Sequence, residues 1–310
     1  MQPHEPPARA IRRILTEQVD EALQHLQKSD QQPDRAVHET RKSYKRIRAV
    51  LRLVRDDIGN KAYKRENIFF RDLGRASAET RDSLVIIRTL DSLMARHEEH
   101  LKVRVAKDVR KHFEEQHAAQ LAGLEADTEH IEQAVEALEA ARERISHIIL
   151  EHEGFGAFKS GLKKIYGDGR DGWHDAYKKG SAEVFHEWRK DVKYLWHQLE
   201  VLTPIWEAVV GEHADELHKL ATMLGDEHDL VVLREALQQL PPDVAEAEAV
   251  LLLTTVIDGE RERLHKLAKP LAKRLYADKP KAFARRLDAY WHAWERENEH
   301  EAAESLITSS

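Results

Sequence analysis

No cysteine occurs in this chain of 310 residues, and aromatic residues make up only 6% of it. The lack of cysteine excludes disulfide bonds, cysteine-ligated zinc or iron–sulfur centres and a thiol nucleophile. The few aromatic residues do not alternate with the basic ones, which argues against stacking platforms for single-stranded nucleic acid. A helical module that binds nucleic acid therefore remains an alternative, but the sequence does not favour it.

Long apolar runs are also missing. The N-terminus MQPHEPPARA has no apolar signal core, and the run VLLLTTVI at 250–257 is far shorter than the roughly 20 residues of a membrane span. We therefore expect a cytoplasmic protein with no membrane partner. No HExxH or carboxylate–histidine pair stands in a convincing arrangement, so no metal site and no cofactor are expected.

The residues that are present favour helices. Ala, Leu, Glu, Lys, Arg and Gln dominate at the expense of β-branched and turn residues, which predicts an all-α fold. Prolines and glycines divide the chain into expected helices at about 8–29, 34–57, 61–97, 100–152, 155–178, 181–202, 204–239, 242–276 and 280–302. The stretch YGDGRDGW at 166–173, with three glycines, is expected to be a loop or a broken helix, and residues 1–7 and 303–310 to be flexible termini.

Charge is segregated along the chain, although its formal sum is −7. Seven Lys or Arg and a single acid lie between His38 and Arg55, whereas six acids and no Lys or Arg lie between Glu125 and Glu139. Because salt confines the reach of a charge to about 8 to 10 Å, a dense basic patch dominates its own surroundings. The overall acidity argues against indiscriminate nucleic-acid binding.

A short basic pattern occurs twice, as HETRKSYKRIR from position 38 and as HEWRKDVKYLW from position 186. At this offset of 148 the matched pairs are His38 with His186, Arg41 with Arg189, Lys42 with Lys190 and Lys45 with Lys193. Beside each pattern, apolar residues recur at steps of three and four, as expected for a helix that packs in a bundle. A second pair, 73–85 and 220–232, places Arg81-Asp82 over His228-Asp229. We expect two antiparallel helical bundles, about 8–153 and 154–302, related by a pseudo-twofold within one domain of residues 8–302.

The cations of the first copy form a stripe that flanks the apolar face. This stripe continues through Arg48, Arg52 and Arg55, and its span from residue 38 to 52 is about 21 Å on a helix. Like charges at such spacing repel one another unless an anion compensates them. Arg and Lys suit contacts with phosphate oxygens, and His becomes a cation just below neutral pH. The duplicated helix therefore predicts binding of an extended anion.

These motifs, in this order, resemble the conserved-histidine α-helical domain (CHAD) family over nearly the whole chain. The resemblance implies non-enzymatic binding of inorganic polyphosphate in a basic central groove, and association with polyphosphate granules. It carries the binding positions His38, Arg41, Lys42, Lys45 and Arg48, and His186, Arg189, Lys190 and Lys193, over to this chain. Arg52, from the same stripe, and Arg81 and His228 complete the candidate set.

The second copy departs from the first. Trp196 replaces Arg48 and Glu200 replaces Arg52, so the first helix is expected to contribute more of the affinity. Trp196 is expected to pack over a neighbouring arginine. The alternatives are a phosphotransfer bundle with His38 as nucleophile and a polyphosphate hydrolase. The sequence offers no carboxylates for a metal within the cationic stripe, and we expect no catalytic residues.

Overall fold

The computed structural model describes residues 1–310 except 29–32, 77, 98–102, 126–127 and 309–310. The described residues form helices and no strand, which confirms the predicted all-α fold. The helices are α1 (Pro7–Leu26), α2 (Pro33–Leu53), α3 (Asn60–Ala76), α4 (Ala78–Arg96), α5 (Val103–Glu125), α6 (Thr128–Ser146), α7 (Gly156–Lys179), α8 (Ala182–Leu202), α9 (Glu212–Gln238), α10 (Ala247–Leu275) and α11 (Pro280–Thr308). A 3₁₀ turn (Thr203–Ile205) and a π-helical turn (Glu207–Gly211) link α8 to α9.

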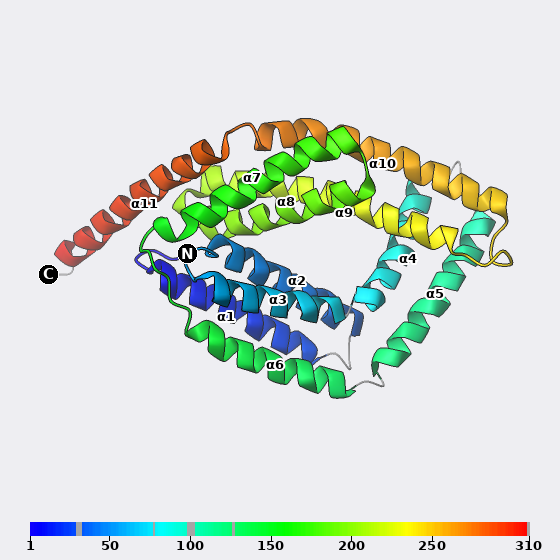
Figure 1. The fold of residues 1–310 in the computed structure, drawn as a ribbon, viewed down its shortest axis with the longest axis horizontal. Helices are drawn as coiled ribbons and strands as arrows, with labels where there is room; N and C mark the ends of the chain where they lie inside the picture. Colours follow the sequence, from blue (N-terminus) through cyan, green and yellow to red (C-terminus); the bar gives the residue numbers. More distant parts are fainter. Residues whose placement is uncertain (29–32, 77, 98–102, 126–127, 309–310) are drawn as a thin grey trace.

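Helices α2 and α8 pack against each other in the middle of the molecule (Figure 1). Helices α1 and α3 pack on α2, and α7 and α9 pack on α8. A second, smaller hydrophobic cluster joins α4 and α5 to the C-terminal part of α9 and the first half of α10. The two copies of the basic pattern therefore meet at the centre. The internal duplication itself stays a prediction.

The apolar faces of α2 and α8 are buried, as their periodicity predicted. Tyr44, Ile47 and Leu51 of α2 lie in the same cluster as Trp188 and Leu195 of α8. Full burial of each such side chain stabilises the fold by about 1.5 to 3 kcal/mol. Because the cations follow the apolar positions by one residue, about 100° of helix, this packing fixes where the charges emerge.

The prediction of a loop or a broken helix at 166–173 is wrong, because α7 continues through this stretch without interruption. Its glycines allow close packing of the helix. A methyl group at Gly169 would lie 2.5 Å from the hydroxyl of Tyr276, and one at Gly172 would lie 3.0 Å from Trp188. About two turns before Gly169, a methyl group at Gly161 would overlap the carbonyl oxygen of Leu53 at the end of α2. These glycines therefore serve helix–helix contact and not chain reversal.

Several expected boundaries also differ. The span 61–97 holds two helices, α3 and α4, and 100–152 holds α5 and α6. Helix α11 runs to Thr308, beyond its expected end at 302, and near the N-terminus Arg13 donates to Glu5 at 2.7 Å. The flexibility of the termini stays a prediction. Within the described ranges, none of the helices combines the length and apolarity that crossing a bilayer requires.

Candidate functional site

A cavity of about 230 Å³ lies between α2, α8 and α9, and we call it the cationic cavity. Six of the predicted binding residues line it: His38, Arg41, Lys42, Lys45, Arg189 and Lys193. Four come from α2 and two from α8, so residues 148 positions apart in sequence share one wall. Helix α9 closes the other side with Thr222, Gly225, Asp226 and Asp229, among others.

Contacts from neighbouring helices hold this arrangement. A buried hydrogen bond of 3.1 Å, from the side-chain amide of Gln198 to the carbonyl of Ala49, joins α8 to α2. The guanidinium of Arg41 donates to the carbonyl oxygen of Gly74 on α3. These contacts restrict the helices and the Arg41 side chain before any ligand arrives, which reduces the entropy lost on binding.

Arg189 is the most buried cation of the cavity, at 9% exposure. Gly225 of α9 faces it, and a methyl group there would lie in ordinary van der Waals contact, 3.6 Å from Nη2 of Arg189. The pKa of nearby Asp226 is raised above its ordinary value by burial and by the charge of Asp229, against the influence of Arg189. The cavity therefore combines a cationic wall with an acidic rim on α9.

Aromatic rings on α8 and α9 form a further part of the lining that the sequence did not predict. Trp196 stacks on His218, with ring centroids 4.0 Å apart and planes 5° apart. The expectation that Trp196 packs over an arginine is wrong, because α9 brings His218 onto its face. Beside it, His197 lines the cavity and its Nδ1 lies 2.7 Å from Glu200. The pKa of His197 is lowered by burial and by Arg46 and Lys193, although Glu200 opposes the shift.

Arg48 and Arg52 do not line the cavity. Both donate to the side-chain oxygen of Asn67 on α3. The guanidinium of Arg52 also lies 4.0 Å from the ring centroid of Tyr194 on α8, and that of Arg48 lies 5.9 Å away. Burial lowers the pKa of Arg48. These two cations pack between helices and hold α2, α3 and α8 together.

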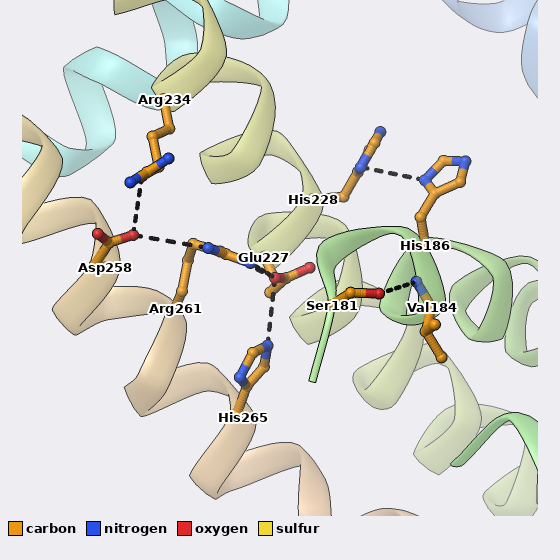
Figure 2. A network of polar contacts seen from close by, with 9 residues as sticks. All are labelled: Ser181, Val184, His186, Glu227, His228, Arg234, Asp258, Arg261 and His265. Atoms are coloured by element: carbon orange, nitrogen blue, oxygen red, sulfur yellow. Dashed lines mark hydrogen bonds and ion pairs between the residues drawn. The ribbon is translucent and has the colours of Figure 1, made fainter. Parts of the chain in front are cut away.

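The other candidates also lie outside the cavity lining. Lys190 is half-buried and forms an ion pair with Glu187. His186 and His228 contact each other, with 3.2 Å between their Nδ1 atoms (Figure 2). Burial, followed by Lys190 and Arg189, lowers the pKa of His186. Arg81 lies in α4, but its side chain is outside the described residues.

The pair of histidines sits beside a separate ionic network (Figure 2). Glu227, next to His228 in α9, accepts from Arg261 at 2.8 Å and lies 3.3 Å from Nε2 of His265, both on α10. Figure 2 also shows the N-terminal cap of α8, where the hydroxyl of Ser181 accepts from the amide of Val184 at 3.4 Å. No three His, Asp or Glu side chains among the described residues are grouped so as to hold a metal ion.

Comparisons with known proteins identify the family and a similar fold. A family model described as the CHAD domain matches residues 13–238, which include every residue of the cationic cavity. The solved structure of PptA from Streptomyces chartreusis is similar, with a TM-score of 0.60 and 14% sequence identity over 88% of this chain and 100% of that chain. At this identity the likeness shows the fold alone. No curated protein matches the chain.

Proposed function

The chain belongs to the CHAD family, as its repeated motif indicated, and we propose that it binds inorganic polyphosphate in the cationic cavity without catalysis. One observation carries this proposal: His38, Arg41, Lys42, Lys45, Arg189 and Lys193 line a single cavity although they belong to two distant segments. A linear anion with a charge on every unit would compensate such a set of like charges.

The proposed mechanism is electrostatic clamping between two helices. Arg41 and Arg189 would hold phosphate oxygens through charge-assisted hydrogen bonds, while Lys45 and Lys193 add compact charges. Binding would release counterions from the polyphosphate, so affinity should fall steeply as salt rises. Asp226 and Asp229 on the opposite wall would keep the anion close to α2 and α8 by repulsion.

A titration tests this function. Long-chain polyphosphate is added to the protein at two salt concentrations, and duplex DNA competes at equal phosphate concentration. We expect tight, salt-sensitive binding of polyphosphate that DNA does not displace. Displacement by DNA at equal phosphate would show a general polyanion binder, and release of inorganic phosphate in the presence of magnesium would show an enzyme instead.

We also propose that the protein associates with polyphosphate granules in the cytoplasm, since a granule presents the same ligand at high local concentration. A fluorescent fusion should colocalise with granules and become diffuse when the cavity cations are replaced. A fusion that stays on granules after those replacements would point to a protein partner.

A further inference from the structure

A second group of cations lies around the corner between α10 and α11, outside the cavity lining. The segment 264–287 contains eight Lys or Arg and a single acid, Asp278, in a chain whose formal charge is −7. All eight cations are exposed: Lys266, Lys269, Lys273, Arg274, Lys279, Lys281, Arg285 and Arg286. We call them the basic corner. They also lie beyond residue 238, where the family match ends.

Most of this charge has no acidic partner. Lys266 pairs with Glu262 at 2.7 Å and Arg286 with Asp278 at 3.0 Å. For Lys269, Lys273, Arg274, Lys279, Lys281 and Arg285, no carboxylate of the described residues lies within 4.0 Å; Lys269 instead lies 5.0 Å from the ring centroid of Tyr177. Uncompensated like charges on adjacent turns repel one another, so an anion that neutralised them would be stabilised there.

Aromatic packing holds the corner against α7. The hydroxyl of Tyr166 donates to the carbonyl of Leu275 and accepts from the amide of Asp278, both at 3.1 Å. The Tyr166 ring stacks on Phe283, with centroids 4.0 Å apart, and Tyr276 lies against Gly169. Contacts with α7 therefore fix the backbone at the end of α10 and at the start of α11, so the corner needs no large rearrangement to bind an anion.

The cations follow the helix axes. Lys266, Lys269 and Lys273 recur at steps of three and four, so they share one face of α10 over about 10 Å. Lys281 and Arg285 are four residues apart and share a face at the start of α11. Figure 1 shows α10 and α11 running along the outer edge of the molecule, with α2 in its interior. None of these cations is among the residues that line the cationic cavity, so the corner offers two short rows of charge, one on each helix, outside that cavity.

We propose that the basic corner is a second contact for the same polyphosphate chain, engaged only by chains long enough to reach it from the cationic cavity. This inference rests on the proposed function of the cavity. A chain held in the cavity would present its free part to the corner at high effective concentration. A long chain that uses both contacts would therefore bind more tightly than a short chain that uses the cavity alone.

Other polyanionic partners fit the corner less well. Among its large apolar side chains only Leu267 is exposed, so a lipid bilayer would find almost no apolar anchor. Duplex DNA is bulky and would meet the acidic remainder of the surface, whereas a thin chain follows a narrow row of charge. Polyphosphate, duplex DNA and phospholipid headgroups all present phosphate groups to the corner. The experiment below distinguishes these three ligands.

The test compares tripolyphosphate with long-chain polyphosphate on a quadruple variant, Lys273→Gln, Arg274→Gln, Lys279→Gln and Lys281→Gln. A charge-matched control replaces the exposed Lys61, Lys64, Lys107 and Lys111 by Gln. We expect the corner variant to bind tripolyphosphate within twofold of wild type, and to lose about tenfold in affinity for the long chain, with a shallower salt dependence. In the control variant, the affinities for tripolyphosphate and for long-chain polyphosphate should both stay within twofold of wild type.

Each outcome is decisive for one of the two proposals. If wild type and the corner variant bind long-chain polyphosphate with equal affinity, the proposal of a second contact is wrong, whereas the proposed function of the cavity is unaffected. A parallel loss of tripolyphosphate binding, with an unchanged melting temperature, would place the corner within the first site and also overturn it. A wild-type protein that binds neither ligand would instead reject the proposed function. Stronger corner-dependent binding to duplex DNA or to phosphatidylglycerol vesicles would assign the corner to that partner.

Discussion

Helices α2 and α8 carry the same basic pattern but use it differently. On α2 the first half of the stripe lines the cationic cavity, whereas Arg48 and Arg52 farther along pack against Asn67 and Tyr194. On α8 the cations end at Lys193, and Trp196 and His197 continue the wall as aromatic rings. The difference teaches that a repeated motif fixes where charges emerge, while the neighbouring helix decides whether they face a ligand or stabilise the fold.

The largest difference between the two helices should appear on charge removal. Arg41→Gln, Lys42→Gln and Lys45→Gln together should lower polyphosphate affinity by about a thousandfold, because hydrogen bonds to charged groups contribute roughly 1.5 to 3 kcal/mol each. The α8 counterpart, Arg189→Gln with Lys193→Gln, removes two cations and should lower it by about a hundredfold. Isothermal titration of both variants measures this, with thermal melts as the check on folding. A larger loss for the α8 variant would reverse the predicted order.

Gly225 sharpens the comparison on the α8 side. Gly225→Ala should leave affinity within twofold, because its methyl group would sit in ordinary contact, 3.6 Å from Arg189. Gly225→Leu should lower affinity about tenfold, since the guanidinium would have to move from the cavity wall. Equal affinities of the alanine and leucine variants would show that Arg189 does not need its present position.

Arg52 tests the structural use of the α2 stripe. Arg52→Gln removes a cation from the face of Tyr194 and a hydrogen bond to Asn67. We expect a loss of about 1 to 2 kcal/mol in the free energy of unfolding, with polyphosphate affinity within twofold. Chemical denaturation and titration of the same preparation separate the two effects. A tenfold loss of affinity at unchanged stability would return Arg52 to the binding site.

The pH dependence should be the smallest effect. In the free protein the lowered pKa of His197 keeps it neutral near pH 7, and burial raises the pKa of Asp226, so its carboxyl takes up a proton more readily than an ordinary aspartate does. A bound polyanion favours the charged imidazole and the uncharged carboxyl, so binding takes up protons. Affinity should therefore rise a few-fold from pH 7.5 to pH 5.5.

His197→Gln separates the two contributions to this pH dependence. The variant should show a shallower dependence of affinity on pH than wild type, with affinity near pH 7.5 within twofold. Titrations in buffers of different ionisation enthalpy would also report proton uptake directly. If the dependence of affinity on pH is the same in the variant as in wild type, His197 does not take up a proton when polyphosphate binds.

The sequence predicted the parts of the site that local periodicity determines. Apolar residues at helical spacing, such as Ile47 and Leu195, indicated the buried faces. Some of the cations one position later, such as Arg41 and Lys193, line the cavity, whereas Arg48 and Arg52 at equivalent positions do not. Six of the twelve proposed residues meet there. This success has a simple cause: the rotation per residue of a helix links a charge to the apolar face beside it.

What the sequence could not predict depends on contacts between distant helices. His218 and Gly225 enter the site because α9 packs on α8. The second repeated motif at 220–232 marked this segment, but only the contact between the helices shows which of its side chains reach the cavity. Likewise Arg48 and Arg52 are directed away by Asn67 and Tyr194, which lie outside the motif. The glycines of α7 indicated a loop because a glycine that ends a helix and one that admits a neighbouring helix look alike in sequence.

The most direct test of the central claim is polyphosphate retention by the double variant Arg41→Glu with Arg189→Glu. Lys107→Glu with Lys111→Glu, on the exposed face of α5, supplies a control of equal charge change. If α2 and α8 clamp the chain between them, the first variant should lose binding at near-native helicity while the control retains it. Undiminished binding by the Arg41 and Arg189 variant would contradict the assignment of the cavity.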